Sequence, residues 1–406
     1  MSFISEVLKS HEEMEPPRTF WYWSSLAAIS AVVKDNIWLD RGGAYKLYPN
    51  IYVMLHAESG AKKGPPVNLA RSLVKKVNNT RVIYGRSSIQ AMVKELGTAY
   101  TLPGGRVLAK SCGFYCASEF TSSLVADPAA ITILTDLYDR IYNEGQWEST
   151  LKMEKLILKD PVLTMLVATN QAHFDAFMEQ KDITGGFIAR TFIINASEEQ
   201  TVNSLVKPLE HPPDKEALAK YLIEMSTLQG PFEPLYNNDY TPSGKIFDDW
   251  YKETKEYIKR EKVKDETGTL NRIGDSVLKV AMLLSLSERP ELVITETAMI
   301  EAIEVCTKLI GGLRRVTSGK NAKGSNAYQK ALIIEELMKR DNHMITRQQL
   351  LKKYYYHFDS LMLNDIIPLL ESAGYLVSEM HGSQVVYKMP EKAYEELKPY
   401  YEGKMK

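Results

Sequence analysis

This 406-residue sequence has few cysteines, little net charge and few long apolar runs. There are three cysteines, Cys112, Cys116 and Cys306. An odd and sparse set argues against a disulfide framework and favours a reducing compartment. Cys112 and Cys116 lie in one apolar run, with no second pair of metal ligands in view. We therefore expect two strand residues in a core rather than a metal site.

The formal net charge is −1, so no global basic field draws the whole chain onto nucleic acid. Any contact with DNA must come from local basic patches. The apolar run from Phe20 to Val33 contains serines and is too short for the roughly 30 Å of a bilayer core, so we expect a buried helix and no membrane contact. Acidic and polar residues from Ser10 to Glu15 precede it, unlike a signal peptide, which favours a cytoplasmic protein.

Short apolar runs alternate with helical patterns in the first half of the chain. Buried parallel strands have this appearance and need helical crossovers, so the alternation predicts an α/β fold, a parallel sheet with helices on both faces. In such sheets, ligands bind beyond the carboxyl ends of the strands. The expected strands lie at 51–55, 81–84, 113–117, 163–168 and 191–194.

The second half of the chain predicts two further regions and a linker. Residues 213–316 carry apolar residues at helical spacing without a confident strand. A polar stretch at 317–326 indicates a linker. Three helical patterns and two strand patterns follow over 328–388, which is the order of a winged helix-turn-helix. The expected domains are 1–205 (α/β core with an N-terminal helix), 206–318 (helical region), 326–390 (winged helix) and 391–406 (charged tail).

The segment after the first expected strand contains the parts of a phosphate site. A glycine-containing loop cradles an anion with backbone N–H groups, while a lysine at the helix start reaches the outer phosphates. Against the strict phosphate-loop pattern, Ala57 and Lys62 replace the two glycines, and Gly64 replaces the hydroxyl that binds Mg²⁺. Considered by itself, the loop sequence therefore supports an ordinary strand–helix turn as well as it supports a phosphate site. The candidate nucleotide-binding residues are Ser59, Gly60, Ala61, Lys62, Lys63 and Gly64.

Polar residues follow two of the other expected strands and precede a third. Glu119 follows the third strand, where a carboxylate orients water or holds Mg²⁺, or is a solvated strand end. Asn170 follows the fourth strand, and Arg190 stands beside Gly185-Gly186 before the fifth. Each is weak evidence alone, and their order after Lys63 is the informative feature.

This order resembles a family of phage and prophage proteins, long known only as a domain of unknown function and read as AAA+ ATPases or helicases. Residues 48–64 resemble its phosphate-loop segment, 113–119 its Walker B strand and 164–170 its sensor 1 strand. Residues 185–190 resemble its glycine–arginine segment, and 269–281 its lid helix with a second sensor arginine, Arg272. MCM-type helicases have a comparable lid followed by a winged helix.

The resemblance implies a P-loop NTPase core of the AAA+ type with a helical lid, and ATP with Mg²⁺ as cofactors. Lys63 then neutralises the β- and γ-phosphates, Glu119 polarises water and holds the metal, and Asn170 senses the γ-phosphate. Arg190 and Arg272 stabilise developing charge, at least one of them across a subunit boundary. A site completed in this way requires a head-to-tail homo-oligomeric ring, and six subunits is the family expectation.

Two basic clusters are candidate DNA contacts. The expected hairpin at 151–159 either grips single-stranded DNA in a ring pore or is a solvated hairpin, with the two readings about equal. The stretch 352–357 either contacts duplex DNA or is a helix end whose tyrosines pack in the core, which is the favoured reading. The candidate DNA-binding residues are Lys152, Lys155, Lys159, Lys352 and Lys353.

Two functions follow. The first is an ATP-dependent DNA-translocating motor, a replicative helicase of a phage or mobile element acting in the host cytoplasm. The second is a hydrolysis-poor nucleotide-binding adaptor on DNA, such as a helicase loader or initiation scaffold. The Gly64-Pro65 pair supplies no hydroxyl for Mg²⁺ and favours the second function. The retained Glu119, Asn170 and Arg190 favour the first.

Overall fold

The chain divides into two compact units in the computed structural model, Met1–Cys306 and Thr307–Lys406. Of the expected helical region, residues 206–306 fall in the unit that contains the sheet and residues 307–318 fall in the other. The structure describes residues 2–78, 80–84, 88–97, 100–101, 107–108, 111–117, 120, 129–139, 146–150, 155–170, 173–174, 186–195, 209–260, 265, 267–317, 322–340, 342–354, 359–382 and 384–402.

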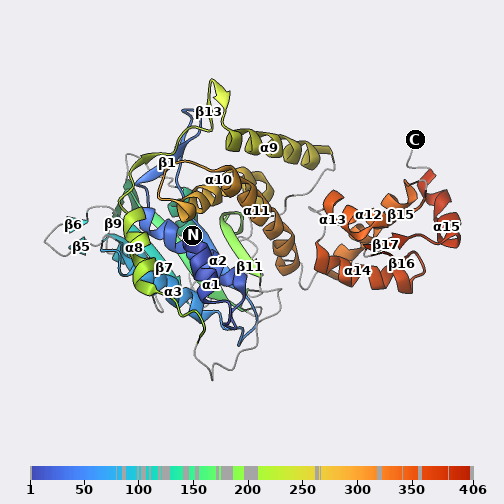
Figure 1. Ribbon diagram of the computed structural model, residues 1–406, viewed down its shortest axis with the longest axis horizontal. Helices are drawn as coiled ribbons and strands as arrows, with labels where there is room; N and C mark the ends of the chain where they lie inside the picture. Colours follow the sequence, from blue (N-terminus) through green and yellow to red (C-terminus); the bar gives the residue numbers. More distant parts are fainter. Residues whose placement is uncertain are drawn as a thin grey trace. The chain divides into compact units, whose positions relative to one another are not determined.

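Unit 1 is built on a five-stranded sheet in which every neighbouring pair is parallel, which confirms the sheet that the alternating pattern predicted (Figure 1). All residues of the three inner strands are buried, which explains their continuous apolar runs. In spatial order the strands are β11 (Thr191–Asn195), β3 (Tyr52–His56), β10 (Val162–Thr169), β7 (Cys112–Ala117) and β4 (Val82–Tyr84).

The strand order creates a switch point between β3 and β10. From β3 the chain runs to β4 at the far edge, returns through β7 to β10, and then crosses over β3 to reach β11. The connections that leave β3 and β10 therefore run in opposite directions. In open α/β sheets, the crevice beyond the carboxyl ends of two such strands is where ligands bind.

Helices cover both faces of the sheet. On one face, α2 (Arg18–Val33) packs through Trp23, whose ring lies 4.9 Å from that of Phe192. On the other face, Tyr52 donates a hydrogen bond of 2.9 Å to the carbonyl of Leu134 in α6 (Ala129–Asp139). α2 is the buried helix expected from the apolar run, and thirteen of its residues are buried.

Cys112 and Cys116 are buried in β7, as the strand interpretation expected, and burial raises the pKa of Cys116 to about 12.

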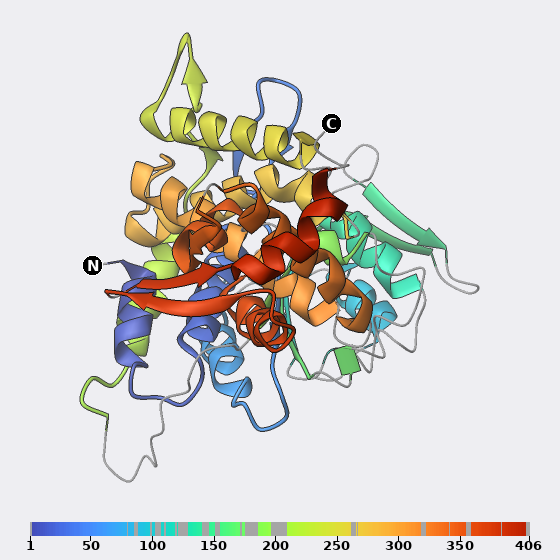
Figure 2. The ribbon, with the colours of Figure 1, turned by 90° about the vertical axis from the view of Figure 1, so that its right-hand side faces the viewer.

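Around the sheet lie α1 (Phe3–Ser10), α3 (Gly64–Val74), α4 (Ile89–Gly97) and α8 (Lys215–Met225). The expected strandless region also contains two-residue strands that the sequence did not indicate. β12 (Gly230–Pro231) pairs with β1 (Ile37–Asp40), which also pairs with β2 (Lys46–Leu47). β13 (Tyr236–Asn237) and β14 (Asp239–Tyr240) form a hairpin beside α9 (Pro242–Arg260), visible in Figures 1 and 2. Two residues are too few to show a strand period.

The long helix α10 (Thr269–Glu288) joins the helical region to the sheet. It packs against α2 and against the short 3₁₀ helix Ile188–Arg190 that precedes β11. α11 (Glu296–Thr317) follows it. Among the described residues, none of the helices combines the length and the apolar character needed to cross a membrane.

The described residues of unit 2 form the end of α11, four further helices and a three-stranded antiparallel sheet of order β15-β17-β16. Thr346 caps α13 in a capping box, and Asp359 caps α14 by accepting from the N–H groups of Leu361 and Met362. The linker prediction was wrong in part, because α12 begins at Ala322. The elements are α12 (Ala322–Met338), β15 (Met344–Thr346), α13 (Arg347–Lys353), α14 (Ser360–Ser372), β16 (Val377–His381), β17 (Gln384–Lys388) and α15 (Glu391–Glu402).

Candidate functional site

The loop between β3 and α3 lies at the switch point of the sheet. The N–H of Ala57 donates to the carbonyl of Thr169 on β10 at 3.4 Å, which ties the start of the loop to the neighbouring strand. Gly60 has φ +92° and Lys62 φ +50°, so the loop bends through the left-handed region twice before α3 begins. Pro65 and Pro66 occupy the first turn of α3 and have no N–H, so this helix start offers fewer donors to an anion than usual.

The two loop lysines take different directions. The ammonium of Lys63 donates to the carbonyls of Ala57 and Glu58 at 2.8 and 2.6 Å, so it lies over the loop itself. Lys62 instead pairs with the carboxylate of Glu15 at 3.4 Å and is 58% exposed. A cation held over a bent loop at a helix start fits the outer phosphates of a nucleotide. Of the two, Lys63 is the lysine placed for that role.

Asn170 lies at the same edge of the sheet, directly after β10. Its Oδ1 accepts from the backbone N–H of His173 at 2.9 Å, which fixes the orientation of the amide. Its Nδ2 then lies 3.3 Å from Nδ1 of His173. Asn170 and Lys63 thus lie on the segments that follow the adjacent strands β10 and β3, at the same edge of the sheet. Glu119 lies outside the described residues, two positions beyond the end of β7.

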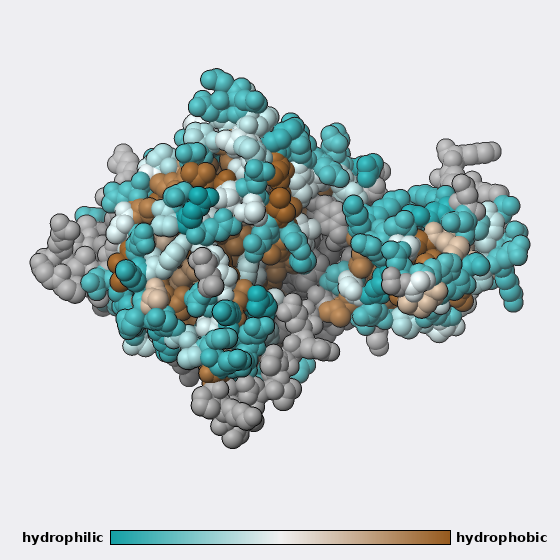
Figure 3. All heavy atoms as spheres, in the orientation of Figure 1, coloured by the Kyte–Doolittle hydropathy of each residue, from teal (hydrophilic) through white to brown (hydrophobic). Residues whose placement is uncertain are grey.

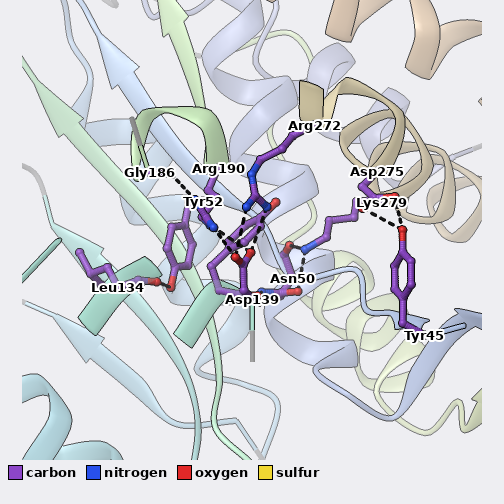
Figure 4. Close-up of polar contacts among 11 residues, drawn as sticks. Tyr45, Asn50, Tyr52, Leu134, Asp139, Gly186, Arg190, Arg272, Asp275 and Lys279 are labelled. Atoms are coloured by element: carbon purple, nitrogen blue, oxygen red, sulfur yellow. Dashed lines mark hydrogen bonds and ion pairs between the residues drawn. The ribbon is translucent and has the colours of Figure 1, made fainter. Parts of the chain in front are cut away.

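The two predicted arginines meet on one carboxylate that the sequence did not single out, Asp139 at the end of α6 (Figure 4). Arg190 donates from Nε to Oδ1 at 3.0 Å and from Nη2 to Oδ2, and its Nη1 donates to the carbonyl of Gly186. Arg272 is more distant, with bonds of 3.2 and 3.4 Å to the same two oxygens. The side chain of Arg190 is 8% exposed and that of Arg272 is 42% exposed.

The electrostatics of this cluster follow from two cations on one anion. Burial alone would raise the pKa of Asp139, but hydrogen bonds and charge pairing with Arg190 and then Arg272 outweigh burial and lower that pKa. Arg190 already neutralises Asp139 with a bidentate pair. The positive charge of Arg272 therefore exceeds what is needed to neutralise Asp139, and we call Arg272 the surplus cation of the cluster.

This cluster lies at the amino ends of the strands, opposite the phosphate loop. Arg190 directly precedes β11, whose first residue Thr191 is level with Tyr52 at the start of β3. The five residues of β3 separate that end from the loop by roughly 15 Å. The structure does not bring Arg190 or Arg272 together with Lys63 of the same chain.

A cavity of about 480 Å³ opens beside Asp139 and contains a buried lysine. Lys279 is 4% exposed, and its ammonium donates to Oδ1 and the backbone carbonyl of Asn50, both at 2.9 Å. It also lies 3.9 Å from the ring centre of Tyr138. Burial lowers the pKa of Lys279 to about 7, although Asp275 and Asp139 oppose that change. A lysine inside a run of apolar helix residues was the sequence signal for this site.

Lys279 predicts a dependence of stability on pH. Its folded-state pKa of about 7 lies below the ordinary value of 10.5, so between these values the unfolded chain binds more protons. The free energy of unfolding therefore rises with pH through this window, by about 2 kcal/mol from pH 7 to pH 9. Chemical denaturation of wild type and Lys279→Met at both pH values measures it. We expect the variant to lack this gain, and parallel pH dependences would contradict the assignment.

Four of the five lysines predicted to bind DNA lie in described residues. Lys159 is exposed at the end of β9 (Lys155–Lys159), which pairs antiparallel with β8 (Gln146–Thr150), so the hairpin begins before the expected range of 151–159. Lys152 lies outside the described residues, and Lys155 is described only as part of β9. In unit 2, Lys352 is exposed, whereas Lys353 donates to the buried carboxylate of Glu336 at 2.8 Å.

Glu336 explains the tyrosine and lysine at the end of α13. Its carboxylate is 2% exposed and also accepts from Arg340 at 2.9 Å and from the hydroxyl of Tyr354 at 2.8 Å. Burial would raise the pKa of Glu336, but these hydrogen bonds, that from Lys353 foremost, lower it. Tyr354 is buried in the core of unit 2, which is the packing reading that the sequence favoured.

Comparison of the chain with protein-family models and with curated proteins gives no match in either case. Within the described parts of the chain, no group of three or more His, Cys, Asp or Glu side chains is placed to hold a metal ion.

Proposed function

We propose that this protein is an ATP-dependent DNA-translocating motor with an AAA+ type core, a replicative helicase of a phage or mobile element. The observation that carries the proposal is the placement of Lys63. Its ammonium lies over the bent loop between β3 and α3, at the switch point of a parallel sheet, and Asn170 directly follows the adjoining strand β10. These are the parts that phosphate binding requires, in the place where such sheets bind ligands.

Each residue at this edge has a distinct role in the proposal. Lys63 exchanges its two carbonyl partners for the outer phosphates of ATP, which supply stronger, charge-assisted hydrogen bonds. The amide of Asn170 contacts the γ-phosphate or the attacking water, and Glu119 polarises that water. Ser59 supplies the hydroxyl of the loop for Mg²⁺, since Gly64 and Pro65 have none.

The arginines support a head-to-tail ring. Because Arg190 and Arg272 lie at the edge opposite Lys63, neither is placed to act on ATP bound to its own chain. A head-to-tail contact brings the amino edge of one subunit to the loop of the next. Arg272 is exposed and is the surplus cation on Asp139, so it is the arginine that reaches a neighbour's nucleotide. Arg190 is buried and holds Asp139 in place.

DNA contact is assigned to the hairpin of β8 and β9 in unit 1. Lys159 is exposed on it, and the adjoining Lys152 and Lys155 give the hairpin three positive charges within eight residues. Phosphate contacts of this kind bind a single strand without reading its sequence. In a ring, hairpins that reach the central pore would contact the strand being moved.

The start of α3 favours a second candidate function, a hydrolysis-poor nucleotide-binding adaptor such as a helicase loader. Pro65 and Pro66 remove two N–H donors from the first turn, and no hydroxyl follows Lys63. Both features weaken the binding of Mg²⁺ and of the phosphates more than they weaken the binding of the base and the ribose.

ATPase turnover with and without single-stranded DNA separates the two functions. For the motor, we predict DNA-stimulated turnover in wild type, and loss of turnover with retained ATP binding in Glu119→Gln, because an amide cannot accept the proton that a carboxylate accepts. Glu95→Gln is the matched control, since Glu95 is exposed on α4. ATP binding without turnover in wild type, with or without DNA, would establish the adaptor instead.

A further inference from the structure

The solvent face of α14 in unit 2 is acidic and apolar. In a winged helix-turn-helix, the second helix of the pair is the one that enters the DNA groove, and α14 has that position in the element order. Residues 360–372 contain no lysine or arginine but include Asp365 and Glu371. Both acidic residues are exposed, as are Leu361 and Leu369 at 40% and 44%. Such a face repels DNA phosphates.

Two cations of α13 are engaged inside unit 2. Arg347 donates to the hydroxyl of Tyr387, to Oδ1 of Asn364 and to the carbonyl of Ser360, each at 2.7 Å. Lys353 is bound to Glu336. The bonds of Arg347 hold α13, α14 and β17 together, and the bond of Lys353 joins α13 to α12. The two cations therefore serve the fold of unit 2 rather than the binding of phosphates.

A groove of about 550 Å³ lies between the β16–β17 hairpin and the start of α15. Its charged lining comprises Glu379, Glu391 and Glu395 against the single Lys388, a net charge of −2 with histidine neutral. The rings of His343 and Tyr394, stacked with centres 4.1 Å apart, also line it. The groove thus combines negative charge with an aromatic surface.

An exposed apolar side chain lines the groove. Val377 is 42% exposed there, whereas Met380 on the same strand, 66% exposed, faces the other side of the sheet because side chains alternate along a strand. Figure 3 shows hydrophobic residues at the surface of unit 2 among hydrophilic ones. Exposed apolar residues beside a charged groove are typical of a protein-docking surface.

Strand addition at β16 is blocked at one point. β16 is an edge strand of its sheet, which ordinarily invites a partner strand. The N–H of Ser378, however, donates to the carboxylate of Glu371 at 3.1 Å. A partner is therefore recognised by its side chains in the groove rather than by extension of the sheet.

We propose that this groove docks a lysine- or arginine-rich segment of a partner protein, with apolar side chains of that segment against Val377 and Tyr394. Three carboxylates around an aromatic surface complement ammonium and guanidinium groups, which also favour aromatic faces. Duplex DNA, in contrast, would bring phosphates against the carboxylates. The proposal concerns unit 2 alone and stands independently of the nucleotide site.

The experiment presents the full-length protein to a phage-displayed library of random twelve-residue peptides. Wild type should enrich peptides with net positive charge and at least one apolar residue. The triple reversal of Glu379, Glu391 and Glu395 to lysine should instead enrich acidic peptides. The triple change to glutamine, a milder variant that guards against misfolding, should bind the wild-type peptides about tenfold more weakly.

The matched control reverses three exposed glutamates of unit 1, Glu224, Glu253 and Glu256, which changes the net charge equally. It should enrich the same peptides as wild type. Enrichment of no consensus, or of the same peptides by wild type and by the groove reversal, would overturn the proposal. So would binding of a 20-base-pair duplex that weakens on Lys388→Glu, because unit 2 would then use this surface for nucleic acid.

Discussion

Lys63→Ala should weaken ATP binding on the order of 100-fold or more, whereas Lys62→Ala should leave it nearly unchanged. The two lysines are neighbours with the same formal charge, yet only Lys63 lies over the loop, and Lys62 pairs outward with Glu15. A charge-assisted hydrogen bond is worth about 1.5–3 kcal/mol, so the loss of two to phosphate oxygens weakens binding on the order of 100-fold or more. Calorimetric titration with ATP and with a non-hydrolysable analogue measures the effect.

Comparing Lys63→Ala with Lys62→Ala separates the effect of where the lysine lies from the effect of the net charge of the loop. An equal loss in both would show that only the net charge of the loop matters, and unchanged affinity in Lys63→Ala would remove the loop assignment altogether. Lys63→Met retains the aliphatic part of the side chain and should behave as Lys63→Ala does. Thermal unfolding of each variant checks that the loop variants still fold.

The sheet was predictable because its strands leave a strong local signal. β3, β7 and β10 are buried along their whole length, so they appear in the sequence as uninterrupted apolar runs. The caps at Thr346 and Asp359 were predictable for a similar reason, since each cap contacts residues two or three positions away.

Elements held by distant contacts were missed. β12 has two residues and exists because Ile37 and Trp38 of β1 pair with it from about 190 positions away. The start of α12 at Ala322 was missed as well, because Ser, Gly and Asn in this stretch are typical of loops. In both places tertiary contacts or neighbouring helix residues override the local preference.

The candidate site was predicted by residue type but not by arrangement. Arg190 and Arg272 stood out beside motif segments, yet the carboxylate that joins them is 51 and 133 positions away along the chain. No periodicity or spacing connects residues so far apart. The arrangement matters because it separates the two arginines into a buried one and an exposed one, which changes what each substitution should do.

Arg272→Ala should remove ATP turnover while leaving nucleotide binding and stability nearly intact. Its side chain is 42% exposed, and Arg190 still neutralises Asp139 without it, so we expect a loss of at most about 1 kcal/mol of unfolding free energy. An arginine that stabilises transition-state charge in a neighbour's site contributes on the order of 10³-fold or more to turnover. Turnover, ATP affinity and denaturant midpoint measured on one preparation give the three values.

Arg190→Ala is the matched control, because it removes the other guanidinium from the same carboxylate. Arg190 is buried, and its loss leaves Asp139 with the longer, weaker bonds from Arg272. Breaking a buried pair costs about 3–5 kcal/mol, so this variant should lose stability first and activity as a consequence. Equal stability losses in the two variants would contradict the division of roles.

Mixing subunits tests whether Arg272 acts across a boundary. Arg272→Ala subunits keep an intact Lys63 loop, and Lys63→Ala subunits keep Arg272, so neither assembly alone completes a site. In mixed rings, an Arg272→Ala subunit that receives the arginine of a Lys63→Ala neighbour has every group that the proposal requires. ATPase activity should therefore reappear on mixing. Its absence in subunits shown by cross-linking to co-assemble would place Arg272 outside the reaction, and a monomer in the presence of ATP and DNA would exclude the ring.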